Sequence, residues 1–162
     1  MAIEKVNFED VEIGQDIAPL TKGPFTTPHL MRWSAAMENW HKIHYDLPFA
    51  TQHDKLPGLL INGSLKQQFL AQIVRDWVGS DGCVWKLRFQ FRAMNLVGET
   101  LTIWGKVTDK RRLEIFGLVD LELGIRNEAG TESTPGSATV ALPFHDGQAV
   151  PYPFPEQIAG GR

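Results

Sequence analysis

Residues 62–78 read NGSLKQQFLAQIVRDWV, and this stretch decides the fold. Its apolar residues recur three and four positions apart, so they share one broad face of a helix. They are Leu65, Phe69, Leu70, Ile73, Val74 and Trp77. Gly79 follows as a typical helix C-cap. The pattern predicts a helix that begins near Asn62-Gly63-Ser64 and runs to about Val78, with one face that must be buried.

The chain after Ser80 has the pattern of β-strands. Polar and apolar residues alternate with a period of two from Val84 to Ala93. Further strands are expected at residues 100–108, 113–125 and 139–142, with turns at 109–112 and 127–130. Short turns between successive strands favour an antiparallel meander with one packed face. Since the segment 65–77 is long and apolar enough to cover that face, we predict an α+β fold in which a curved antiparallel β-sheet wraps around a central α-helix.

The segments before the central helix are shorter and more punctuated. Phe8 to Pro24 is interpreted as a lead-in and an edge strand that ends in a turn. Thr27 followed by Pro28 resembles an N-cap and the first position of a helix, which we expect to end near Asn39. Residues 41–57 lack helical periodicity and form a loop of a length that is usually functional or disordered.

Composition limits the class of protein. The chain has 162 residues, 43% hydrophobic and 22% charged, as expected of one soluble domain, which we place at residues 1–143 before a proline-rich tail at 144–162. Its single cysteine, Cys83, excludes an internal disulfide and a thiolate metal site. A net charge of −3 offers no basic face, so nucleic acid is not an expected partner. No apolar run is long enough for a membrane span and the N-terminus is acidic, so we expect a cytoplasmic protein without a membrane partner.

A dense polar cluster, Asn39-Trp40-His41-Lys42-Ile43-His44-Tyr45-Asp46, lies where the first helix meets the loop. Imidazole is the side chain best suited to proton transfer near neutral pH. Polar residues at a helix end also often only cap it or bond loop backbone. A metal site built from His41, His44, His53 and Asp46 is a further interpretation, but no two of these histidines have the i, i+4 spacing of a helical ligand pair. We therefore expect no bound metal.

The start of the central helix, Pro57-Gly58-Leu59-Leu60-Ile61-Asn62-Gly63-Ser64, is a second candidate. A glycine at a helix N-terminus leaves backbone N–H groups unpaired and lets a ligand approach them, and the helix dipole favours negative charge there. This is an oxyanion hole in outline. An ordinary N-cap, in which Asn62 or Ser64 bonds the helix's own amides, is the alternative.

These segments, with the strand–turn–strand run of residues 89–101, together resemble the MaoC-like acyl dehydratase and (R)-specific enoyl-CoA hydratase family, which has the hot dog fold. The resemblance extends from about Phe8 to Leu142. Its motifs are the lead-in at residues 12–16, the histidine motif at 39–50, the glycine pairs Pro57-Gly58 and Asn62-Gly63, and Arg88 or Arg92 through Gly98-Glu99-Thr100-Leu101.

The resemblance implies reversible addition of water to an α,β-unsaturated thioester of coenzyme A or acyl carrier protein. Coenzyme A would be part of the substrate, and no separate cofactor is implied. By position, His44 corresponds to the family's catalytic histidine, Gly63 to its oxyanion-hole glycine and Asn39 to its catalytic aspartate. Residues expected to contact substrate nearby are Trp40, Tyr45, Asp46, Asn62 and Ser64.

Asn39 departs from the family pattern, because an amide has no pKa suited to a general base. Three interpretations are open: Asn39 orients the water while His44 transfers both protons; Glu38, Asp46 or His41 supplies the second group; or the chain is a catalytically reduced, thioester-binding subunit of a heteromer. A hot dog thioesterase is a further alternative, but the central helix offers one late carboxylate, Asp76. The resemblance also implies a homodimer or a heterodimer with another hot dog subunit.

Overall fold

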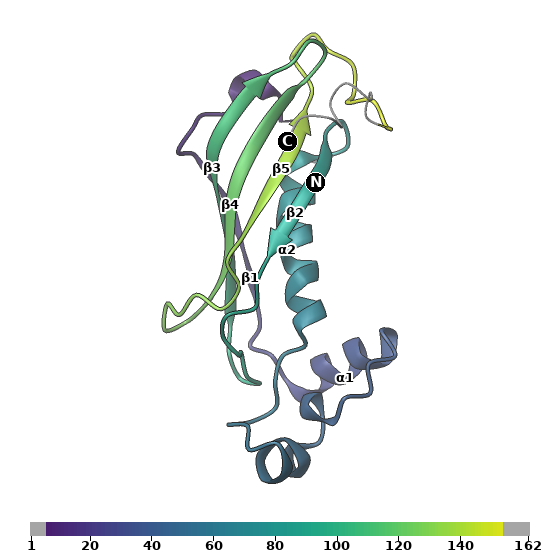
Figure 1. The fold of residues 1–162 in the computed structure, drawn as a ribbon, viewed down its shortest axis with the longest axis vertical. Coiled ribbons are helices and arrows are strands. Elements are labelled where there is room, and N and C mark those ends of the chain that lie inside the picture. Colours follow the sequence, from purple (N-terminus) through teal and green to yellow (C-terminus); the bar gives the residue numbers. More distant parts are fainter. Residues whose placement is uncertain (1–5, 154–162) are drawn as a thin grey trace.

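The computed structural model describes residues 6–153 and consists of one sheet, two long helices and three short helical turns (Figure 1). The strands are β1 (Asp16–Lys22), β2 (Cys83–Phe89), β3 (Leu101–Arg112), β4 (Gly117–Asn127) and β5 (Gly136–Leu142). The helices are α1 (Thr27–Ala36) and α2 (Gly63–Val78). The turns are η1 (Phe8–Asp10), η2 (Lys42–His44) and η3 (Phe49–His53).

The five strands form one antiparallel sheet in the order β1-β3-β4-β5-β2. Strands β3, β4 and β5 form the predicted meander, and β1 is the predicted edge strand. The prediction of one continuous meander was wrong for β2, which pairs with β5 and forms the other edge. Residues between Phe89 and Leu101 therefore leave the sheet, pass the start of α2 through a bridge between Leu60 and Leu96, and return as β3 on the far side.

The core lies between the sheet and α2, whose long axis runs along the strands (Figure 1). The predicted apolar stripe of α2 is buried apart from Trp77, which is half-buried. Alternate residues of β3 face it, from Leu101 to Val107, as a half-buried antiparallel sheet requires. The helix bounds predicted for α2 are confirmed, with Asn62 as N-cap and Gly79 as C-cap.

Several boundaries differ from the prediction. Helix α1 is capped by Thr26 and ends at Ala36, and Glu38 has a φ of 50° that stops the helix before Asn39. Strand β2 ends at Phe89. The turn predicted at residues 109–112 is strand, because this charged stretch continues β3 along β4 and Arg111 pairs with Asp120 at 3.2 Å. The chain turns at residues 113–116 instead.

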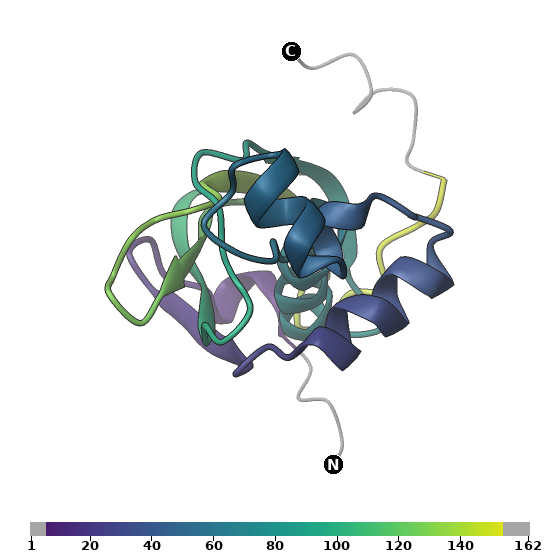
Figure 2. The same ribbon diagram turned by 90° about the horizontal axis from the view of Figure 1, so that it is seen from below.

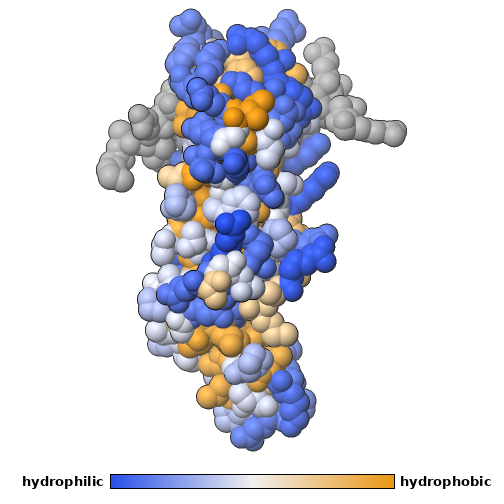
Figure 3. Space-filling model, turned by 90° about the vertical axis from the view of Figure 1, so that its left-hand side faces the viewer, coloured by the Kyte–Doolittle hydropathy of each residue, from blue (hydrophilic) through white to orange (hydrophobic). Residues whose placement is uncertain are grey.

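The segment between α1 and α2 lies at one end of the molecule. Seen from below, α1 and η3 lie on either side of the lower end of α2 (Figure 2). Hydrophobic residues gather on the surface at this end, whereas hydrophilic residues dominate most of the length above it (Figure 3). Among residues 6–153, no helix combines the length and apolar character that crossing a membrane requires.

The start of the proline-rich tail packs on the N-terminal lead-in. The rings of Phe144 and Phe8 meet edge to face at 5.8 Å, and His145 Nε2 lies 2.8 Å from Asp10 Oδ1. Val150 N–H donates to the Asp81 oxygen at 2.7 Å. This part of the tail therefore packs on the domain, while residues 154–162 lie outside the described part of the chain.

Candidate active site

His44 ends the short turn η2 and is buried, with 7% of its surface exposed. Its Nδ1 atom lies 2.8 Å from the backbone oxygen of Leu60. The Leu60 N–H in turn donates to the Ile43 oxygen at 3.1 Å. These two bonds fix the imidazole beside the strand-like segment that leads into α2, three residues before Gly63.

The bond to Leu60 also decides which nitrogen of His44 is basic. A carbonyl oxygen only accepts, so Nδ1 carries the proton and Nε2 keeps its lone pair. Burial lowers the pKa of His44 below 6.5, the Leu60 bond opposes this shift, and the charge of His41 adds to it. The side chain is therefore held neutral near pH 7, with a proton-accepting Nε2.

The N-terminus of α2 presents unpaired donors. The amides of Gly63 and Ser64 begin the helix and donate to no group within residues 6–153. A Cβ at position 63 would lie 3.1 Å from the ring of Phe91, which packs over this glycine. Without a side chain at position 63, the Phe91 ring can pack against the backbone of Gly63, and a ligand can approach the amide of the same residue. The alternative of an ordinary N-cap was wrong: Asn62 is the N-cap by position, but its side chain makes no capping hydrogen bond, and the Asn62 and Ser64 side chains bond to α1 instead.

Two consecutive residues of α1 hold this end of α2. Trp33 Nε1 donates to Ser64 Oγ at 2.9 Å, and Asn62 Nδ2 donates to Ser34 Oγ at 3.1 Å. Asn62 and Ser34 are both fully buried. The Asn62 Oδ1 atom is buried without a hydrogen-bond partner in the described part of the chain. We call these two hydrogen bonds the α1–α2 clasp.

Asn39 lies just after α1 and is half-buried. Its N–H donates to the Ser34 oxygen at 2.9 Å, and its Oδ1 accepts from the His41 N–H at 3.3 Å. Its Nδ2 makes no hydrogen bond to any of residues 6–153. The side-chain oxygen thus shapes the turn into η2, while Nδ2 is available as a donor.

The other residues expected at the site bond mainly to the loop itself. Tyr45 donates its hydroxyl to the Trp40 oxygen at 2.7 Å, and Trp40 is 57% exposed. Asp46 Oδ1 accepts from the Phe49 N–H at 3.0 Å and so caps η3. Glu38 is exposed. These contacts are structural, and none of them brings a carboxylate into hydrogen-bond contact with His44.

The metal interpretation has no geometric support. Within residues 6–153, no three His, Cys, Asp or Glu side chains are grouped so as to hold a metal ion.

One polar group near the site was missed by the sequence analysis. Lys66, one turn into α2, is 3% exposed, and its Nζ donates to the Ala93 oxygen at 3.1 Å and to Asn95 Oδ1 at 3.0 Å. Asn95 Nδ2 donates to Glu99 at 2.8 Å. Burial lowers the pKa of Lys66 to about 8, against the attraction of Glu99. This network fixes the segment that places Phe91 over Gly63. In the sequence, a lone lysine on an apolar helix was the signal that could have indicated this buried group.

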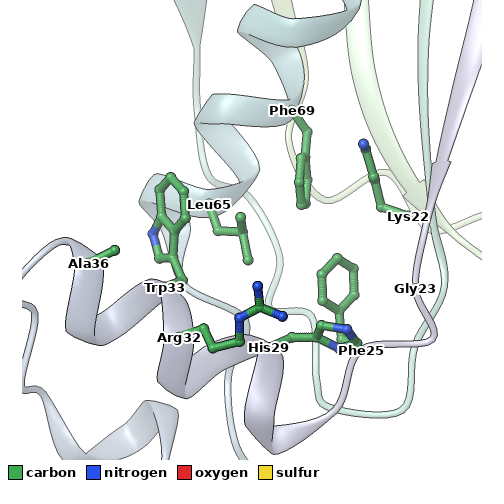
Figure 4. Close-up of a pocket in the computed structure, with 9 residues that line it drawn as sticks. All are labelled: Lys22, Gly23, Phe25, His29, Arg32, Trp33, Ala36, Leu65 and Phe69. Atoms are coloured by element: carbon green, nitrogen blue, oxygen red, sulfur yellow. The ribbon is translucent and has the colours of Figure 1, made fainter.

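A pocket of about 620 Å³ lies beside the clasp, between α1, α2 and the end of β1 (Figure 4). Trp33 forms one of its walls. Neither His44 nor Gly63 lines it. The clasp bond from Trp33 to Ser64 is what connects the pocket to the start of α2.

Comparison with known proteins agrees with this geometry. A family model described as hydroxyacyl-thioester dehydratase type 2 matches residues 9–99. Mesaconyl-C(4)-CoA hydratase of Chloroflexus aurantiacus is 41% identical over 46 residues, which are 28% of this chain and 16% of that protein. The chain therefore matches only a small part of that relative's length.

Solved structures show the same architecture. The (R)-hydratase of A. caviae, involved in PHA biosynthesis, superposes with a TM-score of 0.74 at 23% identity, covering 83% of this chain and 99% of that one. The ChsH1–ChsH2 complex of Mycobacterium tuberculosis gives a TM-score of 0.69 at 14% identity, covering 81% of this chain and 98% of that one. These likenesses confirm the predicted hot dog fold. Because the family model covers more than half of the chain, and includes the histidine motif and the start of α2, the protein belongs to the family of type 2 hydroxyacyl-thioester dehydratases.

Proposed function

We propose that the chain is a hydro-lyase that reversibly adds water across the α,β double bond of an acyl thioester. The observation that carries this proposal is His44: a buried, neutral imidazole whose Nδ1 is held by Leu60 and whose Nε2 is left basic. Its partner Leu60 lies three residues before a helix N-terminus with unpaired amides. A base and an oxyanion site in this proximity suit proton transfer next to a thioester carbonyl.

In the hydration direction, the thioester oxygen accepts hydrogen bonds from the amides of Gly63 and Ser64. Nε2 of His44 removes a proton from water as the water oxygen bonds to C3. The electron pair of the double bond moves onto the thioester oxygen, and the N-terminus of α2 stabilises this enolate charge. The imidazolium then delivers its proton to C2, so one water is added and His44 is neutral again. Dehydration is the same sequence in reverse.

His44 transfers both protons in this scheme, and Asn39 orients the water. Support comes from Asn39 Nδ2, a donor with no partner in the described chain, and from the loop roles of Asp46 and Glu38 given above. Oδ1 of Asn62 offers a buried acceptor for the water or for the product hydroxyl.

Coenzyme A is the carrier we propose, as part of the substrate and without a separate cofactor. The carrier is named in the mesaconyl-C(4)-CoA hydratase relative, and the family description names a hydroxyacyl thioester. Acyl carrier protein is the alternative carrier. It is tested by offering the same acyl group on both.

We further propose that the chain works as a pair, either with a second copy or with another hot dog subunit. Strand β2 has a free edge, and Phe91 and Met94 beside it in sequence are 52% and 57% exposed. The solved ChsH1–ChsH2 structure is a complex. The mass of the purified chain in solution, measured by light scattering, separates a homodimer from a monomer that awaits a different partner.

The test of the proposed activity is loss of absorbance at the enoyl-thioester band when the purified protein meets enoyl-CoA substrates, with His44→Ala alongside. Loss of the general acid–base is expected to lower kcat/KM by about 10²–10⁴-fold. His53→Ala, at an exposed histidine outside the site, is the matched control and retains full activity. A His44→Ala rate equal to that of the parent overturns the proposal. Thioester binding without turnover by the parent protein instead assigns it the role of a thioester-binding subunit.

A further inference from the structure

The pocket beside the α1–α2 clasp combines an apolar interior with positive charge. Phe25 and Phe69 contribute rings with centroids 5.8 Å apart, and Leu65 and Trp33 complete the apolar lining (Figure 4). Lys22 and Arg32 enter from different sides, from the end of β1 and from α1. Such an interior accepts a hydrocarbon chain. Lys22 is half-buried and Arg32 is exposed, so both cations are accessible to an anionic group of a bound molecule.

No residue between positions 6 and 153 supplies an anionic partner for these two cations. The pocket lining contains no aspartate or glutamate, and neither Lys22 nor Arg32 forms an ion pair within residues 6–153. Lys22 Nζ instead lies 5.6 Å above the ring of Phe69. In Figure 4 the guanidinium of Arg32 extends into the space between Trp33 and Phe25.

His29 adds a neutral donor to the same wall. The Thr26 N–H donates to His29 Nδ1 at 3.0 Å, so this nitrogen is unprotonated and Nε2 carries the hydrogen. The ring packs edge to face on Phe25 at 6.0 Å, which fixes its orientation. The pocket therefore presents three donor groups and no carboxylate.

The position of the pocket links it to the thioester site. Its wall, Trp33, bonds Ser64, whose amide is one of the unpaired donors proposed to hold the thioester oxygen. A thioester carbonyl bound there places one arm of the substrate along Trp33. The apolar lining suits the acyl arm.

We infer that this pocket binds the acyl end of the substrate and selects acyl groups that carry a carboxylate distal to the thioester. This inference rests on the proposed function, because it uses the same thioester site. A distal carboxylate that reaches Arg32 or Lys22 gains a charge-assisted hydrogen bond. A purely aliphatic end displaces water from both cations and offers them no hydrogen bond in its place.

Binding of unreactive saturated thioesters tests this independently of catalysis. Adipyl-CoA and hexanoyl-CoA have acyl groups of equal carbon number and the same carrier, and they differ in the end group. Calorimetry on the full-length protein is expected to show adipyl-CoA binding at least 10-fold tighter, a preference within the range of a charge-assisted pair. The preference is expected to fall to near one in Arg32→Gln/Lys22→Gln, while Arg75→Gln, at an exposed arginine near the end of α2, keeps it.

Three outcomes overturn the inference. Equal affinity for the two thioesters, or no binding of either, removes the selection for a carboxylate. An equal loss of affinity for both thioesters in the double variant shows that the cations contact the carrier's phosphates instead. Since neither ligand has a double bond, failure of the proposed hydration is seen separately, as absence of turnover on any enoyl thioester.

Discussion

The imidazole rings of His41 and His44 lie 6.2 Å apart between centroids, at an angle of 60°, with His41 exposed and His44 buried. His41 is therefore close enough for its charge to disfavour a proton on His44. Burial is the larger cause of the lowered pKa of His44, and His41 adds to it. In the proposed mechanism, we therefore expect the acidic limb of the pH–rate profile to depend on His41, a residue that need not contact substrate.

We expect kcat/KM to rise with pH through a pKa below 6.5 and to be level above it, because the neutral form of His44 is the base. His41→Gln removes the neighbouring charge, so the pKa of His44 should rise and the acidic limb of the pH–rate profile should move to higher pH. The same shift links to stability: the unfolded chain binds more protons between the lowered pKa and 6.5, so the free energy of unfolding decreases as pH falls through this window. A pH–rate profile of both proteins measures the shift. A limb that moves to lower pH in His41→Gln contradicts the assignment.

Gly63→Pro removes one proposed oxyanion donor at a helix position where proline is tolerated. Asn62, with φ −57° and ψ 131°, already has a conformation compatible with a following proline. Gly63→Ala is the matched control, since it adds the same Cβ against Phe91 but keeps the N–H. We expect kcat for the proline variant to be about 10²–10³-fold below that of the alanine variant, as for loss of an oxyanion donor. Equal rates, with both variants folded by circular dichroism, show that this amide is not used.

Asn39→Ala is expected to lower kcat/KM by about 10-fold or less, far below the effect of His44→Ala, because an orienting hydrogen bond contributes about 1–1.5 kcal/mol. Asn39→Asp introduces a second titrating group, so its pH–rate profile should gain a further acidic limb. Steady-state rates over pH 4–9 compare the two variants directly. An Asn39→Ala rate as low as that of His44→Ala would show that Asn39 is indispensable to proton transfer.

Lys66→Met leaves the Ala93 oxygen and Asn95 Oδ1 without their buried donor. We expect a loss of about 1–3 kcal/mol in the free energy of unfolding near pH 7, the cost of unsatisfied buried acceptors. Chemical denaturation measures this loss, with Lys106→Met on the exposed face of β3 as the control.

The lowered pKa of Lys66 also predicts how the free energy of unfolding changes at alkaline pH. Its pKa of about 8 in the folded protein lies below the ordinary lysine value of 10.5, so the unfolded chain binds more protons between these pH values. The stability of the parent protein should therefore rise relative to Lys66→Met as pH increases through this window. If the stability of the parent protein instead falls relative to Lys66→Met over this pH window, Lys66 does not have a pKa lowered by burial.

The central helix and most strands were predictable because their buried residues recur with the local period of a helix or a strand. The stripe from Leu65 to Val74 has helical spacing, and β3 alternates from Leu101 to Val107. The pairing of β2 with β5 was not predictable, since no local pattern states which strand lies beside which. Residues 109–112 were mistaken for a turn because charged residues at an exposed strand end resemble loop composition.

The candidate site divides in the same way. The sequence motif indicated His44 and Gly63, and the structure supplies a buried base and unpaired amides at those positions. The partners that hold the site come from distant segments: Ser34 lies 28 positions from Asn62, and Asn95 lies 29 positions from Lys66. Burial of Lys66 runs against the usual preference of lysine for the surface, which is why the sequence analysis did not include this residue.

The α1–α2 clasp has a consequence for how this protein can change its substrate. Trp33 and Ser34 are adjacent, so the residue that shapes the pocket wall and the residue that bonds Asn62 move as one rigid unit. A replacement of Trp33 that enlarges the pocket also releases Ser64 and displaces the donors beside it, so wider acceptance comes with slower turnover. Phe25 lies across the pocket and makes neither hydrogen bond of the clasp. A smaller residue at position 25 therefore enlarges the pocket while the bond from Trp33 to Ser64 stays in place, so it is the first position to change for a wider range of acyl groups.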